Sequence, residues 1–187
     1  NKNLIEPISG DFGRAKGRLW IQGNKMGLLA SREAAELEII KNEKLIARVL
    51  APSFWISTDG SIEIQKGSFV AYMGLKDSLY HPLIRANWHA KDRTLHIKKL
   101  DGIAEERLLF EDSYHQIRIS ADLAILKTNE TKIDFYRISG KSQVPAWIES
   151  FDYYSPDRIE MLQGALTFDP MRVLYNFLID TKRNWAY

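Results

Sequence analysis

The stretch from Ile117 to Lys127 has the sequence IRISADLAILK. Apolar residues occupy every second position from Ile117 onward, and polar or small residues stand between them. Successive side chains of a strand point to opposite faces of a sheet, so this alternation predicts a β-strand with one buried face. We expect one strand over residues 117–127. The side chains that it should bury are those of Ile117, Ile119, Leu123 and Ile125.

The same alternation recurs at residues 62–65, 84–91 and 94–98, and turn-forming pairs separate these segments. Asp59-Gly60 predicts a type I′ hairpin turn, because both positions of that turn require positive φ. Residues 32–51 fit either a helix capped by Ser31 or a hairpin around a polar centre. The neighbouring segments are strands, so we favour the hairpin.

These patterns predict an all-β fold, a sandwich-like assembly of about a dozen short, mainly antiparallel strands with one C-terminal helix. A β-solenoid segment is the alternative, because the strands are evenly spaced although no repeated motif is found. We predict a β domain over residues 1–168 and the helix over residues 169–187. Asp169 suits the N-cap and Pro170 the first helical position. A further unit of a longer parent chain could begin there.

Composition excludes several classes of protein. The chain has 187 residues, 45% of them hydrophobic, which is enough for one domain with a core. Its 26 basic and 24 acidic residues give a net charge of +2, without the basic stripe that nucleic-acid binding requires. The absence of cysteine excludes disulfides and thiolate metal sites. No apolar run reaches the ~18 residues of a membrane-spanning helix.

Two histidines are candidate metal ligands. If Asp92-Arg93 is a two-residue turn, His89 and His96 lie directly opposite each other on a polar face. Three cations share their surroundings and oppose a bound metal ion: Arg85, Lys91 and Lys98. We therefore predict no metal at these histidines. His81 precedes Pro82, and we place it in a turn.

We assign no catalytic residue and no cofactor. The early glycines match neither a dinucleotide fingerprint nor a phosphate-binding loop, and no serine-nucleophile or zinc-helix motif is present. Asp152 and Asp157 flank Tyr153-Tyr154 and are the most suggestive carboxylate pair. A chain with 24 acidic residues contains such pairs by chance, so they do not establish glycoside hydrolysis.

Aromatic residues provide the best candidates for ligand binding. Exposed Trp and Tyr rings stack on sugars and offer contact area at low entropic cost. Trp147, Tyr153 and Tyr154 lie close together in the sequence and are the candidate ligand-binding residues. The competing interpretation is packing in a core or against a neighbouring domain. Trp55 and Trp88 share faces with buried positions, and we expect them in the core.

Several short motifs follow one another in a recognisable order. These are DSLYHPL at 77–83, FEDSYH at 110–115, ESFDYY at 149–154, LQG at 162–164 and DP at 169–170. Over residues 77–178 the chain resembles the long uncharacterised hypothetical proteins of Bacteroidetes. The resemblance implies a cell-envelope or secreted location and a much longer parent chain. It implies no activity and no site residue.

We therefore expect a non-catalytic structural or interaction module of a larger cell-envelope or extracellular protein. A carbohydrate-binding module is the alternative, and a glycan-processing enzyme the second alternative. The expected partners are other domains of the parent chain or other proteins, and glycans in the alternatives. The chain lacks an initiator Met and has Trp185 and Tyr187 near its end, so we expect an excised piece. Its terminal helix should dock partly on the β core, because several apolar side chains would otherwise be exposed.

Overall fold

A computed structural model describes residues 8–10, 12–23, 25–74, 76–100, 108–130 and 132–151. These residues form an all-β structure in which every strand pairing is antiparallel, as the sequence predicts. Coils of a β-solenoid stack their strands in parallel, so the alternative does not fit the described residues. The predicted helix over residues 169–187 lies outside them.

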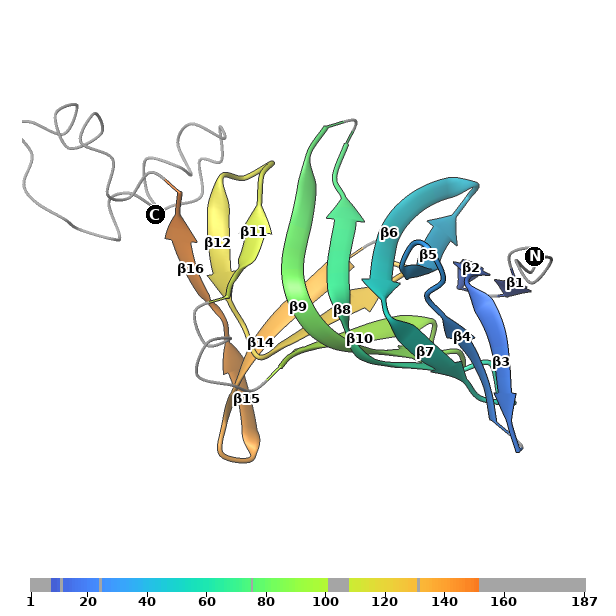
Figure 1. Ribbon diagram of the computed structural model, residues 1–187. Coiled ribbons are helices and arrows are strands. Elements are labelled where there is room, and N and C mark those ends of the chain that lie inside the picture. Colours follow the sequence, from blue (N-terminus) through green and yellow to red (C-terminus); the bar gives the residue numbers. More distant parts are fainter. Residues whose placement is uncertain are drawn as a thin grey trace, which may run out of the picture.

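The strands form two layers of a single hydrogen-bonded sheet (Figure 1). The upper layer contains β1 (Ile8–Gly10), β2 (Gly13–Lys16), β5 (Ala35–Lys41), β6 (Lys44–Ala51), β11 (Phe110–Asp112), β12 (Ile117–Ser120) and β16 (Trp147–Ser150). The lower layer contains β3 (Arg18–Gln22), β4 (Lys25–Leu29), β7 (Ser53–Ile56), β10 (Thr94–Lys99), β13 (Leu123–Lys127), β14 (Lys132–Ser139) and β15 (Ser142–Pro145). Two long strands, β8 (Ile62–Tyr72) and β9 (Ser78–His89), run through both layers. The sandwich-like prediction is thus confirmed, with both layers belonging to one sheet.

The two layers are joined where β8 and β9 bend together. The register between these strands shifts on both sides of Gly67. At the bend the buried residues of each strand are three positions apart, whereas elsewhere along the strand they are two positions apart. On one side of the bend β8 pairs with β7, and on the other side it pairs with β6. Bulges and bends are the usual means by which a strand passes from one packed sheet to another.

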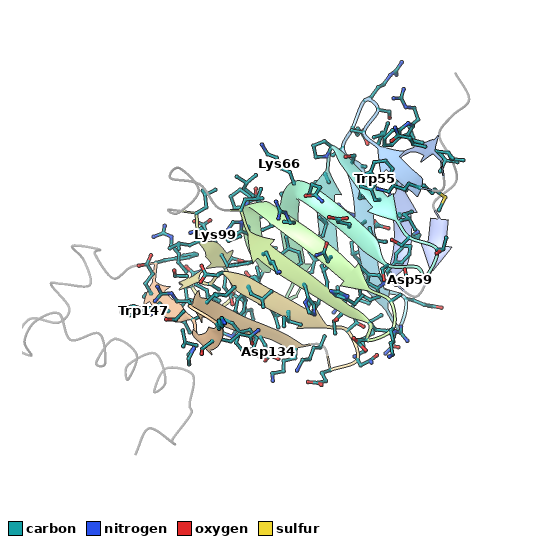
Figure 2. All side chains as sticks on the ribbon, turned by 90° about the horizontal axis from the view of Figure 1, so that it is seen from below. Trp55, Asp59, Lys66, Lys99, Asp134 and Trp147 are labelled. Atoms are coloured by element: carbon teal, nitrogen blue, oxygen red, sulfur yellow. The ribbon has the colours of Figure 1, made fainter. Side chains whose placement is uncertain are left out.

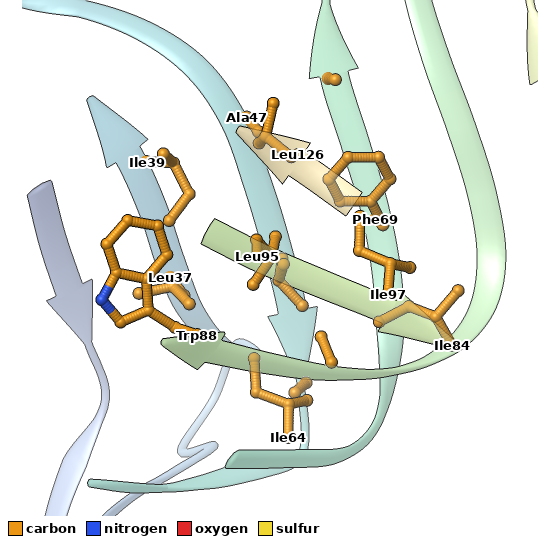
Figure 3. Close-up of a cluster of buried hydrophobic side chains, with 14 of the residues drawn as sticks. Leu37, Ile39, Ala47, Ile64, Phe69, Ile84, Trp88, Leu95, Ile97 and Leu126 are labelled. Carbon is orange, nitrogen blue, oxygen red and sulfur yellow. The ribbon is translucent and has the colours of Figure 1, made fainter. Parts of the chain in front are cut away.

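The core lies between the layers. Figure 3 shows side chains from β5, β6 and β8 pointing toward those from β10 and β13, with Trp88 at one side. Fully buried members from both layers include Leu37, Phe69, Ile84, Trp88, Leu95 and Ile97. Burying each such side chain contributes roughly 1.5–3 kcal/mol, so the facing layers hold the bent sheet together.

Contacts between distant strands hold the layers against each other. The ring of Phe12, beside β2, meets the ring of Trp88 on β9 edge-on, with centroids 6.4 Å apart. At the hairpin tips, Lys41 Nζ at the end of β5 donates to the carbonyl of Asn129 in the β13–β14 turn at 2.7 Å. Both contacts join segments that are several strands apart in the sheet order.

The predicted strand over residues 117–127 is divided in two. β12 and β13 are separated by Ala121-Asp122, where the chain passes from the upper to the lower layer. Ile119 and Leu123 are buried as predicted. After the break, the inward positions are Ala124 and Leu126, and Ile125 is only half-buried. Ile117 is half-buried as well. The irregularity shifts the alternation by one residue. In β13, the face that the sequence predicts to point toward the core therefore lies on the other side of the sheet.

The hairpin prediction for residues 32–51 is confirmed by β5 and β6. Asn42 and Glu43 both have positive φ, as a type I′ turn requires. The same geometry was expected at Asp59-Gly60, and there it is wrong. Of this pair only Gly60 has positive φ, while the Asp59 carboxylate accepts a hydrogen bond from the Ser61 backbone.

Gly67 should be essential to the bend. A Cβ at this position would lie 2.5 Å from the Leu50 carbonyl oxygen and 3.2 Å from Ala51 Cβ. We predict that Gly67→Ala lowers the free energy of unfolding by about 1–3 kcal/mol, the usual cost of overpacking. Urea denaturation would measure it. Gly74→Ala is the control, because nothing lies within 4 Å of a Cβ there. Equal stability of the two variants would contradict the prediction.

Candidate functional site

The outer face of the lower layer carries a row of aromatic and hydrogen-bonding side chains; we call this face the outer lower face. One row of residues runs across this face, on the side of the sheet opposite the core. Each residue of the row is the register partner of the next one on the neighbouring strand. The row consists of Trp20, Gly27, Trp55, Glu63, Asn87, His96, Ile125 and Asp134. Figure 2 looks onto this face, with Trp55 near one end of the row and Asp134 near the other.

Two tryptophans form the aromatic end of the row. The rings of Trp20 and Trp55 have centroids 4.4 Å apart and are tilted by 48°. Gly27 lies between them, and Trp55 ring carbons are 3.2 and 3.4 Å from the place where a Cβ would stand. A side chain at Gly27 would therefore push the Trp55 ring off the sheet. Both rings are half-buried, so the expectation that Trp55 belongs to the core is wrong. The fully buried Trp88 confirms the other half of that expectation.

His89 and His96 are neighbours on the outer lower face, but not in the expected register. His89 pairs with Thr94 and His96 with Asn87, so the turn is longer than two residues. The two imidazoles are diagonal neighbours with ring centroids 4.4 Å apart. Partial burial, followed by the charges of His89 and Lys98, holds the pKa of His96 below its usual value. Within the described residues, no group of three His, Asp or Glu side chains could hold a metal ion.

Basic side chains lie beside this row. Arg85 on β9 stands directly opposite Lys98 on β10, and both are exposed. Lys66 occupies the irregular part of β8 that faces Arg85 and is exposed as well. None of the three makes an ion pair with a residue in the described ranges. From the sequence, Arg85 and Lys98 are predicted only to oppose a metal ion at the histidines.

The predicted ligand-binding residues lie elsewhere. Trp147 is 69% exposed on β16, and the Arg137 guanidinium lies 5.6 Å from its ring centroid. Tyr153 and Tyr154 lie outside the described residues, as do Asp152 and Asp157. The structure therefore describes one member of the predicted aromatic group. Trp20, which sequence reasoning missed, could have been found from Gly27, since a glycine within a strand often marks a close approach.

His81 is fully buried in the middle of β9, so its placement in a turn is wrong. It stands at the bend, where its Nδ1 accepts a hydrogen bond from the Leu83 backbone N–H at 3.2 Å. Its ring packs against Phe110 with centroids 4.6 Å apart. Burial, with a smaller effect of the Lys99 charge in the same direction, lowers its pKa to about 4.

Comparisons with family models, curated proteins and solved structures find no match to this chain. Among the described residues, none belongs to a helix long and apolar enough to cross a membrane.

Burial of His81 should make the fold sensitive to acid. Well above pH 6.5 the imidazole is neutral in both the folded and the unfolded state. As the pH falls from 6.5 toward 4, the unfolded chain binds a proton that the folded chain does not. The free energy of unfolding should fall by about 3 kcal/mol over this range, since each pKa unit corresponds to about 1.4 kcal/mol.

Urea denaturation of the wild type and His81→Leu across this pH range would test the prediction. The substitution removes the titrating group, so the pH slope should become shallower even if the variant is less stable overall. A slope that is unchanged in His81→Leu would show that another group causes the acid sensitivity.

Proposed function

We propose that this chain acts as a non-catalytic interaction module of a larger cell-envelope or secreted protein, and that β16 is its docking edge. The observation that carries the proposal is the exposure of this strand. β16 pairs with β12, and the described residues supply no second neighbour for it. An unpaired edge is a template for strand addition by another chain or domain.

The backbone of β16 supports strand addition. The Phe151 N–H, which follows the strand, donates to the Gln116 carbonyl at 2.9 Å and so points toward the β12 side. Backbone groups of alternate residues in an antiparallel strand point in opposite directions. The N–H and C=O of Ile148 are therefore turned away from β12, toward the free edge.

The side chains of β16 support it as well. One inward row of the upper layer passes through Phe110 and Ile119, which are buried, and ends at Ile148, which is 59% exposed. A strand added beside β16 would continue this apolar row along with the hydrogen-bond ladder. The partner that fits is the edge strand of another β module, and a second copy of this chain is the simplest such module.

Sedimentation velocity of the 187-residue chain, from micromolar to millimolar concentration, would test the proposal. The wild type should associate as its concentration rises. Ile148→Pro removes an outward N–H, Ile148→Lys places a charge in the apolar row, and both should stay monomeric. Ile138→Lys is the matched control, because Ile138 is 52% exposed but lies on β14.

Two results would contradict the proposal. One is a wild-type chain that remains monomeric at the highest concentration. The other is association that persists in both Ile148 variants, which would place the contact on another surface.

A further inference from the structure

Three basic residues lie on neighbouring strands at the bend. Arg85 and Lys98 are directly opposite on neighbouring strands, and Lys66 lies in the irregular part of β8 on the other side of Arg85. Like charges in directly opposite positions destabilise a sheet. No carboxylate in the described residues lies within ion-pair distance of them.

One row of the upper layer shows cations that are paired with an anion within the sheet. Glu38 on β5 lies in register between Arg14 on β2 and Arg48 on β6. Its carboxylate is 3.1 Å from Arg14 Nε and 3.2 Å from Arg48 Nη2. Cations and anions thus alternate across those strands. At the bend, the part of the chain that the structure describes places no such anion beside Arg85 and Lys98, and a bound ligand could supply it.

We propose that the outer lower face binds an acidic oligosaccharide. Its carboxylate or sulfate group sits between Arg85 and Lys98, and its sugar rings extend past Asn87 and His96 toward Trp55. The guanidinium fork and the ammonium group both form strong charge-assisted hydrogen bonds with such anions. The proposal is independent of docking at the β16 edge. It places the carbohydrate-binding alternative on residues other than Trp147, Tyr153 and Tyr154.

The dimensions of the face suit a chain of sugars. Trp55 on β7 and Lys98 on β10 are three strands apart, about 14 Å at the usual strand spacing. Between them, the side chains of Glu63, Asn87 and His96 offer hydrogen-bonding groups at successive strand positions. Trp55 and Trp20 add apolar ring surface at the far end, on which the C–H face of a sugar can pack.

The position of Glu63 favours a sugar over a nucleic acid. Aromatic rings and cations together also bind single-stranded nucleic acid, whose backbone carries a charge at each nucleotide. Glu63 is exposed and lies between the tryptophans and the basic residues, where it would repel such a backbone. A sugar hydroxyl can instead donate a hydrogen bond to this carboxylate.

Isothermal titration calorimetry of the 187-residue chain would test the proposal. The acidic probes are an oligogalacturonate and a heparin-derived oligosaccharide, and fully methyl-esterified oligogalacturonate is the uncharged counterpart. We expect at least one acidic probe to bind and the esterified probe to bind at least about tenfold more weakly. Arg85→Gln and Trp55→Ala should each weaken binding about tenfold, and salt should weaken it further.

Two further variants separate lost binding from lost folding. Lys141→Gln removes an exposed lysine from the β14–β15 turn and should bind like the wild type. Lys98→Glu should abolish binding while raising the melting temperature, because it places a carboxylate opposite Arg85.

Single-stranded oligonucleotides and anionic lipid vesicles complete the set of probes. Three results would overturn the proposal. The first is no binding of either acidic oligosaccharide. The second is binding that Arg85→Gln leaves unchanged. The third is tighter binding of the oligonucleotide or the vesicle through the same residues, which would assign this face to a nucleic acid or a membrane surface.

Discussion

The two layers depend on the bend that β8 and β9 share. Gly67 allows the backbone of β8 to approach the Leu50 carbonyl of β6, where a Cβ would stand only 2.5 Å away. On β9, Pro82 has no N–H to give to the ladder, and the next N–H, that of Leu83, is bonded by His81 inside the core. A glycine on β8 and a histidine hydrogen bond on β9 thus accommodate the irregular backbone at the bend. Without the bend, the inward rows of the two halves would not face each other, and residues such as Trp88 and Leu95 would lose their burial.

A single sheet that is folded over itself has edge strands in both of its layers. β15 and β16 are consecutive in the chain, yet β15 ends the lower layer and β16 ends the upper layer. The inward row that is buried at Phe110 and Ile119 therefore reaches solvent at Ile148. Natural proteins commonly protect such edges with charges, bulges or short strands. β16 is short, but its central position carries an exposed isoleucine, which suits an edge that is covered in a larger assembly.

The strands could be predicted from the sequence, because alternation is a local property. The points at which strands change layer could not be predicted, because they depend on pairing with other strands. Residues 117–127 show one continuous alternation, and the break at Ala121-Asp122 arises from pairing with different strands on either side. The burial of His81 depends on Phe110, which is remote in the sequence. For the outer lower face, the histidine proximity could be predicted from one hairpin. The Trp20–Trp55 pair could not, because it requires the non-local pairing of β4 with β7. The Arg85–Lys98 pair lies within the same hairpin as the histidines, so the proximity of these two residues could also be predicted from the sequence.

The two opposite basic residues of this hairpin carry an electrostatic cost. A cross-strand pair of like charges costs roughly 0.2–1 kcal/mol relative to neutral residues, and exposed positions accept many neutral alternatives. Elsewhere the same chain places Glu38 between two arginines and Asp134 within 3.0 Å of Lys127 and 2.8 Å of Lys132. In both of these places the sheet supplies an anion next to its cations. Neither the bend nor the core requires a cation at Arg85 or Lys98, since both side chains point away from the core. An electrostatic cost without a structural benefit is the pattern expected when the benefit is realised only with a ligand present.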